Sequence, residues 1–530
     1  MKKLFLLFLL GTFHLPILAA DAGQENMFMR AMRDEMQRTQ KQLRTAGSPA
    51  PFFTAYTVID NTTLSAVANF GQMVIFPHTQ EGVFVSTLMS VGNGKNDNWG
   101  LDNTRLLLYQ GQAPRSYYGV RQSLWDLSDT AYAKAIQIYD AKQAFKRNKN
   151  ITNTLPDFLP AKKVTITRPV TTPELLDNPT IEKLVRELSD WGKDKKFVEN
   201  FSVAITHSHR TTYYLNSEDT TYQGSNATLS VTWQAKIRHK TGFVQAFVQE
   251  EKFLRLDEPT LAEIHQISEK FRTEVESAFL AAKATESYVG PVLLEPDAAA
   301  WMLRSVFLNN ITNLKPLLNT AAQSGGNFRD KQDKRVMSNL ITIYDRPQMQ
   351  EYKNRPLAFR TALDDEGVLA QELVLAQGGK IKDFPRSRRP LDKQAKSNGH
   401  GIIPLGTLSF PREGITNVWV EAVRPQTPAQ LEAQLLAKCR DMELEYCYII
   451  KSLPLPIAQR IYTADGHKEN VFGLKLTGIT NRALRDIIGA GDNYEVTDNG
   501  HIVIPSLLLE ELEFVPDTEE PDKPPFVPKP

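Results

Sequence analysis

The sequence has few cysteines, almost no net charge and one long apolar run. Only Cys439 and Cys447 occur among 530 residues, so a hydrophobic core rather than a set of disulfides must stabilise the fold. In an oxidising compartment the two cysteines could pair, and two buried thiols are an equal alternative. A formal net charge of +1 gives no reason to expect binding to nucleic acid or to an acidic membrane surface.

Short catalytic motifs are also missing. The chain has no glycine-rich phosphate loop, no Gly-x-Ser-x-Gly elbow and no Cys-x-x-Cys pair, which excludes the usual signatures of nucleotide binding, serine hydrolysis and thiol redox chemistry. No His-Glu dipeptide occurs, and of nine histidines only His207 and His209 lie close together. On a strand these two would share one face, which is compatible with metal ligation. A solvated strand face is the favoured interpretation.

The apolar run lies at the start of the chain. Two lysines precede it, it extends from Leu4 to Leu10, and small residues follow near Ala20 and Ala22. This pattern predicts a cleaved signal peptide over residues 1–22 and a periplasmic or secreted protein with no integral membrane segment. An uncleaved anchor is the alternative, but Gly11, His14 and Pro16 interrupt the run before it could span a bilayer.

The region 23–285 mixes helical and strand patterns and is predicted to form an α+β domain with an antiparallel sheet. Apolar residues at helical spacing predict helices over 27–43, 123–145, 181–191 and 257–284, the second with a capping box from Ser123 to Asp126. β-Branched and aromatic residues predict separate short strands, with turns at Gly224 and Gly242. The predicted strands are 52–60, 67–76, 83–91, 201–206, 211–216, 228–236 and 243–253.

The region 286–515 reads mostly as short strands and turns, which predicts a β-rich carboxy-terminal domain. Helical patterns interrupt it at 298–309, 428–442 and 481–488. Residues 516–530 are dominated by proline and charged residues and are predicted to be a disordered tail. The predicted fold class is therefore α+β, with two domains.

Several polar segments of the second half occur in a distinctive order. Leu363–Val368 contains three consecutive acids, and a hairpin turn is favoured there over a cation site. Arg386, Arg388 and Arg389 form a basic cluster that could hold an anion, although a solvated loop is favoured. A Ser-Asn-Gly-His-Gly loop follows at 397–401.

The order and spacing of these segments resemble the carboxy-terminal half of the TldD/PmbA (TldD/TldE) metallopeptidase family. A weaker likeness covers 32–38 and 124–132. The resemblance implies a zinc sequence of histidine, glutamate, three residues and histidine after a Gly/Pro-Val-Leu-Leu strand. Here that strand is 290–294, and the three positions are occupied by Glu295, Pro296 and Ala300. No zinc or other cofactor is expected in this chain. Glu295 and Asp297 could form a carboxylate pair, but charge at a helix start is favoured.

The resemblance also implies that the 397–401 loop and the Asn417 region face the substrate cleft. Asn398, Gly399 and His400 supply donors, an acceptor and a backbone that can approach a ligand closely. We therefore predict a peptide-facing loop with these residues and Asn417. A polar hairpin loop with capping side chains is an equal alternative.

Three functions fit the sequence. The first is a non-catalytic, zinc-less subunit of an exported peptide-degrading complex, paired with a related zinc-bearing sister or with itself and binding extended peptides. The second is an autonomous peptidase with an unrecognised site, for instance near His400. The third is a periplasmic peptide-binding or assembly protein that kept the fold and lost proteolysis. Whether the chain is an enzyme stays open.

Overall fold

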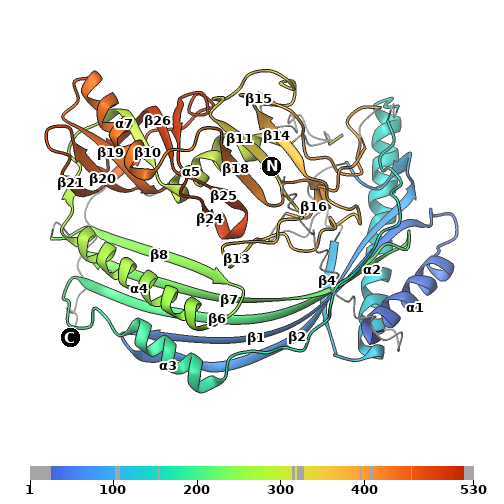
Figure 1. Ribbon diagram of the computed structural model, residues 1–530. Coiled ribbons are helices and arrows are strands. Elements are labelled where there is room, and N and C mark those ends of the chain that lie inside the picture. The colour runs from blue at the N-terminus through green and yellow to red at the C-terminus, as the bar shows by residue number, and fades with distance from the viewer. Residues whose placement is uncertain are drawn as a thin grey trace, which may run out of the picture.

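The computed structural model describes residues 26–101, 108–152, 155–240, 242–312, 317–318, 328–393, 396–404, 410–454 and 456–518. The predicted signal peptide and residues 519–530 of the predicted tail lie outside this set. The described residues form an N-terminal part, 26–279, and a C-terminal part, 282–518, which lies along one side of the first (Figure 1).

The N-terminal part is built on an eight-stranded sheet of unusually long strands. Its path is β3-β2-β1-β6-β7-β5, with β4 on β2 and β8 on β7, and all pairs are antiparallel except β5 with β7. The strands are β1 (Pro51–Asn69), β2 (Gln72–Asn93), β3 (Asn96–Asp97), β4 (Leu108–Ala113), β5 (Thr165–Thr167), β6 (Val198–Asn216), β7 (Thr221–Arg238) and β8 (Val244–Phe253). The two pieces predicted at 201–216 are one strand. The predicted turn at Gly224 is wrong, because Gly224 lies inside β7.

One face of this sheet is apolar and carries four helices. Leu64, Ala66 and Ala68 alternate along β1 and pack with α3 and α4, while Tyr56 and Val58 pack with α1 and α2. The helices are α1 (Met27–Gln42), α2 (Tyr117–Asn148), α3 (Asn178–Ser189) and α4 (Glu258–Phe279). Helix α2 begins earlier than predicted, because Ser116 rather than Ser123 accepts the capping hydrogen bond, from the Gly119 amide.

The opposite face, here called the polar face, is lined mostly by polar side chains, with Arg210 as a charged member and Ile59 as an apolar one. It contains the odd-numbered residues of β1 from Thr57 to Ser65 and the even-numbered residues of β6 from Thr206 to Tyr214, which lie opposite one another in the register. Thr228, Ser230 and Thr232 continue it on β7. The C-terminal part meets the sheet from this side, since Arg360 donates to Thr228 Oγ1 at 2.7 Å.

The C-terminal part contains two larger sheets and a shared core. One follows β22-β26-β10-β19-β20-β21-β9 with β23 on β26, and the other follows β15-β14-β11-β18-β25-β24. Buried residues of both sheets and of α5 and η1 form one hydrophobic cluster, so this helical segment lies between them. Cys439 on α7 and Cys447 on β19 form a disulfide, with their Cα atoms 6.0 Å apart.

The strands of the C-terminal part are β9 (Ala282–Lys283), β10 (Tyr288–Leu294), β11 (Ile341–Asp345), β12 (Glu351–Tyr352), β13 (Arg355–Pro356), β14 (Leu373–Gln377), β15 (Lys380–Ile381), β16 (Gly401–Ile402), β17 (Arg412–Glu413), β18 (Val418–Ala422), β19 (Tyr446–Ser452), β20 (Ile457–Tyr462), β21 (Lys468–Phe472), β22 (Leu474–Leu476), β23 (Ile487–Ala490), β24 (Glu495–Thr497), β25 (Ile502–Ile504) and β26 (Leu507–Pro516). The helices are α5 (Pro296–Leu303), the π-helical turn η1 (Arg304–Leu308), α6 (Asn309–Ile311), α7 (Pro428–Asp441) and the 3₁₀ turn η2 (Asp498–Gly500). The helix predicted at 481–488 is wrong, since this segment consists of turns that lead into β23.

These elements confirm the predicted α+β fold class, with an antiparallel sheet and helices first and a β-rich region second. None of the helices in the described ranges combines the length and the apolar character that crossing a bilayer requires.

Candidate functional site

The positions that would carry zinc in the resembled family lie at the start of α5. Glu295 precedes the helix as its N-cap residue, without a capping hydrogen bond from its side chain, and Pro296 begins the helix. Pro296 and Ala300 are both buried, and Ala300 is 2% exposed. Asp297, in the first turn, is exposed.

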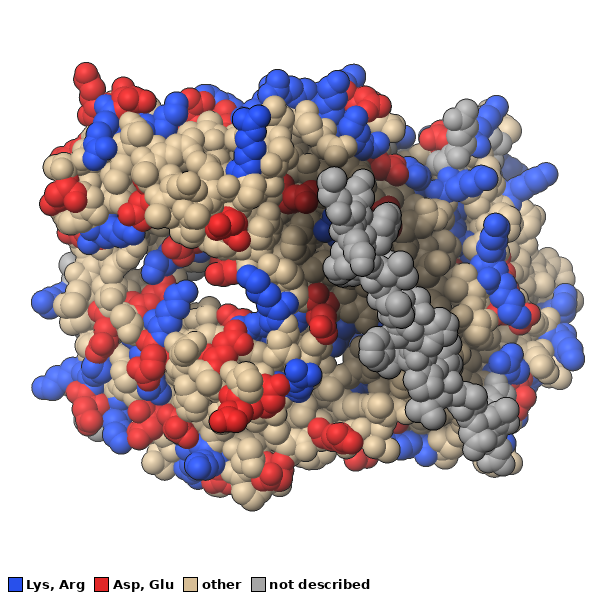
Figure 2. Space-filling view, viewed as in Figure 1, with Lys and Arg blue, Asp and Glu red and all other residues tan. Residues whose placement is uncertain are grey.

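Glu295 and Asp297 line a cavity of about 620 Å³ between the N-terminal and C-terminal parts. Strand β8 and helix α4 contribute one wall, and α5, β24 and η2 contribute the other. Figure 2 shows an opening between the two parts, with side chains of both charges around it. The start of α5 therefore faces a polar space rather than a packed core.

Ion pairs join the walls of this cavity. Arg355 lies 3.0 Å from Glu251 and 2.7 Å from Glu263, and Lys451 lies 3.5 Å from Glu274. Three further carboxylates of the lining have no ion-pair partner among the described residues: Glu295, Asp297 and Glu495.

The surrounding protein removes part of the water around both carboxyl groups at the start of α5, and this desolvation is the main cause that raises their pKa, although Asp297 is open to the cavity. For Glu295, nearby Lys451 and Lys270 oppose this rise in pKa, whereas for Asp297 the neighbouring Glu495 adds to it. Both groups therefore accept a proton more readily than free carboxylic acids.

These residues do not fit the zinc ion that the resemblance implies. A zinc site with a catalytic water needs three donor groups and a general base. Ala300 has no donor atom, Pro296 cannot act as a base, and both cysteines are used in the disulfide. Among the described residues no three His, Cys, Asp or Glu side chains are placed so that they could share a metal ion.

Two free sheet edges meet in the same cavity. Strand β8 pairs only with β7 and β24 pairs only with β25, within the described part of the chain. Phe247–Lys252 on β8 and Glu495–Thr497 on β24 line the cavity without interruption. Consecutive strand residues line a space together when the edge of the strand faces it, because side chains alternate between the faces. The cavity thus offers unpaired backbone groups from two sides.

The predicted substrate-facing residues lie elsewhere and are buried. Asn398, His400 and Asn417 are 3%, 0% and 2% exposed. The Asn398 side chain accepts from the Arg386 amide at 2.8 Å and donates to the Phe384 carbonyl at 2.9 Å. Its peptide-facing role stays a prediction, and these contacts describe a residue that holds a loop together.

The Asn417 side chain likewise makes hydrogen bonds to backbone groups of a neighbouring segment. Its side-chain nitrogen donates to the carbonyls of Met349 and Phe359, each at 2.7 Å, and its side-chain oxygen accepts from the Phe359 amide at 2.9 Å. Gly399 has a positive φ of 77°, and a Cβ there would lie 2.4 Å from the Ala370 Cα, so only glycine fits. The loop is shaped by close packing.

His400 pairs with a buried carboxylate. Its Nε2 lies 3.3 Å from Asp345 Oδ2, and its Nδ1 lies 3.0 Å from the Asn398 carbonyl. Burial alone would raise the pKa of Asp345, but His400 and the hydrogen bonds from Thr416 outweigh burial and lower it. Sequence reasoning missed Asp345, which lies 55 residues before His400 and has no local motif around it.

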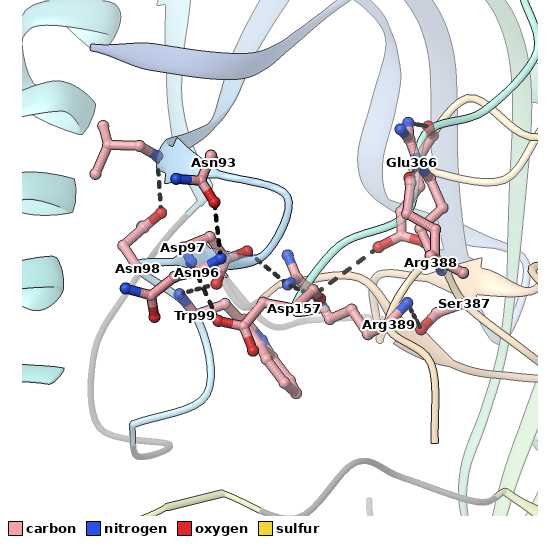
Figure 3. A network of polar contacts seen from close by, with 12 residues as sticks. Asn93, Asn96, Asp97, Asn98, Trp99, Asp157, Glu366, Ser387, Arg388 and Arg389 are labelled. Carbon is pink, nitrogen blue, oxygen red and sulfur yellow. Dashed lines mark hydrogen bonds and ion pairs between the residues drawn. The ribbon is translucent and has the colours of Figure 1, made fainter. Parts of the chain in front are cut away.

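A network of buried charges joins the two parts of the molecule, and Figure 3 shows it from close by. Arg388 donates two hydrogen bonds to Glu218 of the N-terminal part, at 2.6 and 2.7 Å. Arg389 donates to Asp97 at 2.9 Å, and Lys142 lies 2.6 Å from Asp157 and 3.3 Å from Asp97. The prediction of a solvated loop is wrong for Arg388 and Arg389, because both side chains are buried and pair with carboxylates of the first part.

One acid of the predicted turn, Glu366, belongs to this network. Residues 364–367 do form a turn, since the Gly367 amide donates to the Asp364 carbonyl at 3.1 Å. Glu366 Oε2 accepts from the Arg388 amide at 2.6 Å. Burial raises the pKa of Glu366 to about 7 and that of Asp365 to about 6, against the opposing effect of nearby arginines.

The two close histidines are also buried, which contradicts the prediction of a solvated strand face. His207 and His209 are 6% and 5% exposed. The Leu176 amide donates to His207 Nδ1 at 3.1 Å, and His209 Nε2 lies 2.9 Å from Thr171 Oγ1. Burial lowers the pKa of both rings, so they act as neutral hydrogen-bonding groups under the 171–176 segment.

Comparison with known proteins gives one family and several similar structures. Residues 285–515 match the family described as the PmbA/TldA metallopeptidase C-terminal domain. A search of curated proteins gives no significant match. A protein from Thermotoga maritima described as a putative modulator of a DNA gyrase has a TM-score of 0.62 and 14% identity, over 92% of this chain and 100% of the other.

TldE from Thermococcus kodakarensis has the same TM-score of 0.62 and 14% identity, over 91% of this chain and 99% of the other. A putative modulator of DNA gyrase from Bacteroides thetaiotaomicron has a TM-score of 0.60 and 12% identity, over 92% of this chain and 98% of the other. At such low identity these likenesses show a shared fold, which extends over both parts of the molecule.

Proposed function

This chain is a member of the TldD/PmbA family, and we propose that it acts as a non-catalytic, zinc-less subunit of an exported peptide-degrading complex. One observation carries the proposal. At the start of α5, where the family's zinc groups are implied, Pro296 and Ala300 provide neither a base nor a ligand, while a cavity of about 620 Å³ lies beside them.

The cavity suits an extended peptide. The free edges of β8 and β24 present backbone donors and acceptors, with which a peptide can pair as an added strand. Main-chain pairing of this kind depends little on side chains, so the subunit would bind unfolded segments of many sequences. Catalysis would come from a related zinc-bearing sister subunit.

Export has independent support. The expected signal peptide directs the chain out of the cytoplasm, and the Cys439–Cys447 disulfide is of the kind that persists in oxidising compartments. The mature protein would act in the periplasm or be secreted.

Proline substitutions at neighbouring positions of β8 test the peptide site. Adjacent residues of a strand direct their amides to opposite sides, so only one of Val248→Pro and Gln249→Pro removes a bond to β7. That variant should unfold more easily. The other should keep its stability and lose binding of a short fluorescein-labelled unstructured peptide, measured by fluorescence anisotropy. Unchanged peptide affinity in the stable variant would contradict the proposed site.

Metal analysis and co-purification test the rest of the proposal. The protein purified alone should contain no stoichiometric zinc and should leave unstructured peptides intact. Together with a zinc-bearing sister chain it should form a complex that cleaves them. Chelator-sensitive cleavage by this chain alone would overturn the proposal, and peptide binding with no sister subunit would instead indicate a binding or assembly protein.

A further inference from the structure

A second hollow, of about 290 Å³, lies at one end of the boundary between the two parts, where α4 faces β20 and β21 (Figure 1). Polar side chains form its border and bind one another, since Gln459 donates to Asn470 at 2.8 Å and Lys451 lies 3.5 Å from Glu274. Such a hollow suits an apolar side chain on an extended segment. Its apolar floor consists of side chains that are 2–8% exposed: Ala278, Ala458, Val471 and Phe472.

The chain leaves the described ranges beside this hollow. The Asp517 amide donates to the Gly473 carbonyl at 2.7 Å, and Gly473 directly follows Phe472 of the floor. Residues 519–530 continue from there. Phe526 comes nine residues after Asp517, and each residue of a polyproline helix adds about 3.1 Å, which gives a reach of roughly 28 Å. The segment 519–530 is therefore long enough to place Phe526 in the hollow.

The sequence of this segment matches an apolar hollow with a polar border. Phe526 is its single aromatic residue and stands among the prolines of 524–528. Prolines at this density favour the polyproline helix, which proteins bind in grooves that contain aromatic side chains, and Phe472 provides one here. Because the helix is largely formed before binding, its docking loses little conformational entropy.

The charges at the exit point also favour this occupant. Lys475 lies 2.9 Å from Asp517. The Lys283 Cγ would lie 3.5 Å from a Cβ at Gly473, and among the described residues Lys283 has no carboxylate within ion-pair distance. Three of the four residues in 519–522 are acids. The acidic beginning of the segment thus starts next to two lysines, which attract it toward the hollow.

We propose that residues 524–528 bind this hollow of their own chain, with Phe526 on the apolar floor and the acids of 519–522 near Lys283. The bound segment would contact α4 of the N-terminal part and β20 and β21 of the C-terminal part, and so connect the two parts at this end of their boundary. The hollow shares Lys270, Glu274 and Lys451 with the peptide cavity. A bound segment therefore also occupies one end of that cavity.

A peptide added to a shortened chain tests the docking. A fluorescein-labelled peptide of residues 519–530 should bind the chain truncated after Thr518, measured by fluorescence anisotropy. It should bind the full chain at least tenfold more weakly, because the chain's own segment competes at a high effective concentration. An F526A peptide should lose at least tenfold in affinity for the truncated chain, and a K529A peptide should bind as the parent does.

Three results would overturn the proposal. They are no binding to the truncated chain, equal binding to the full and truncated chains, and equal binding of the parent and F526A peptides. Equal binding to both chains would mean that the hollow takes a segment of another molecule rather than its own.

Substitutions on α4 assign the binding to the hollow. Ser277 and Thr273 line it, so S277W and T273W in the truncated chain should each fill it and abolish binding of the peptide. Q266W, at an exposed position of the same helix outside the hollow, should bind as the truncated parent does. Melting temperatures check that each variant is folded, and two tryptophan positions are used so that one folded variant suffices. Undiminished binding in a folded S277W or T273W variant would overturn the assignment.

One consequence rests on the proposed function. Since the segment occupies one end of the peptide cavity, the truncated chain should bind an unrelated unstructured peptide several-fold more tightly than the full chain does. Equal affinities would overturn the position of the segment at that end. If neither chain binds the unrelated peptide, the proposed function fails, while the 519–530 peptide still decides the docking.

Discussion

At one end of the boundary between the two parts of the molecule, Arg388 and Arg389 are 1% and 2% exposed and meet carboxylates of the other part. At the other end, Glu295 and Asp297 line a cavity and have no ion-pair partner among the described residues. In the first region the charged groups are held by hydrogen bonds and ion pairs. In the second region the carboxylates have no ion-pair partner and can interact with a ligand. This difference indicates that the first region holds the parts together and the second receives a ligand.

The largest expected effect comes from breaking the fixed region. Arg389→Gln leaves Asp97 buried with one partner fewer, which should lower the free energy of unfolding by about 3–5 kcal/mol. Arg386→Gln is a matched control in the same segment. Its partner Asp383 is about one-third exposed, so the loss should be about 0–1 kcal/mol. Chemical unfolding curves measure both, and equal losses would remove the distinction between the buried and the surface arginine.

A pH dependence should come next in size. The pKa of Glu366 is about 7 in the folded protein and 4.5 when unperturbed, so the folded state binds more protons between these values. Stability should therefore fall as the pH rises from about 4.5 to 7. Glu366→Gln should reduce this fall by roughly 1–3 kcal/mol, measured as unfolding free energy at pH 5 and pH 7.5. An unchanged pH profile would show that Glu366 does not titrate in this window.

The smallest effect is expected in the cavity. Asp297→Asn removes a charge that has no ion-pair partner in the described residues, and desolvation in the cavity together with Glu495 already raises the pKa of this carboxyl. The unfolding free energy at pH 7 should change by no more than about 0.5 kcal/mol. A loss comparable to that of Arg389→Gln would mean that α5 depends on this charge, and the contrast between the two regions would disappear.

The helices with an apolar stripe and the apolar pieces of the strands could be predicted from the sequence. Met27–Gln42 and Pro428–Asp441 appear within two residues of their predicted bounds, because each has a helical apolar stripe. The long strands appeared in pieces because the polar face places Thr, Ser and Asn between the apolar residues. Long-range pairing, not local pattern, makes β6 continuous.

The candidate site could be predicted only in what it lacks. Pro296 and Ala300 exclude the zinc groups from the sequence alone. Burial of Arg388 and Arg389 could not be foreseen, since charged residues are mostly exposed and their partners Glu218 and Asp97 lie 170 and 292 residues away. The cavity could not be foreseen for the same reason, because β8 and β24 are far apart in the sequence and meet only in the tertiary structure.

The charge network that crosses the boundary has a consequence for folding. If either part unfolded first, Arg388 and Arg389, or Asp97 and Glu218, would be left without their counterions. Each part thus supplies the counterions for the buried charges of the other, and both should unfold on heating in one cooperative transition. A break in the peptide near residue 280 would then yield two insoluble fragments rather than two independent folding units.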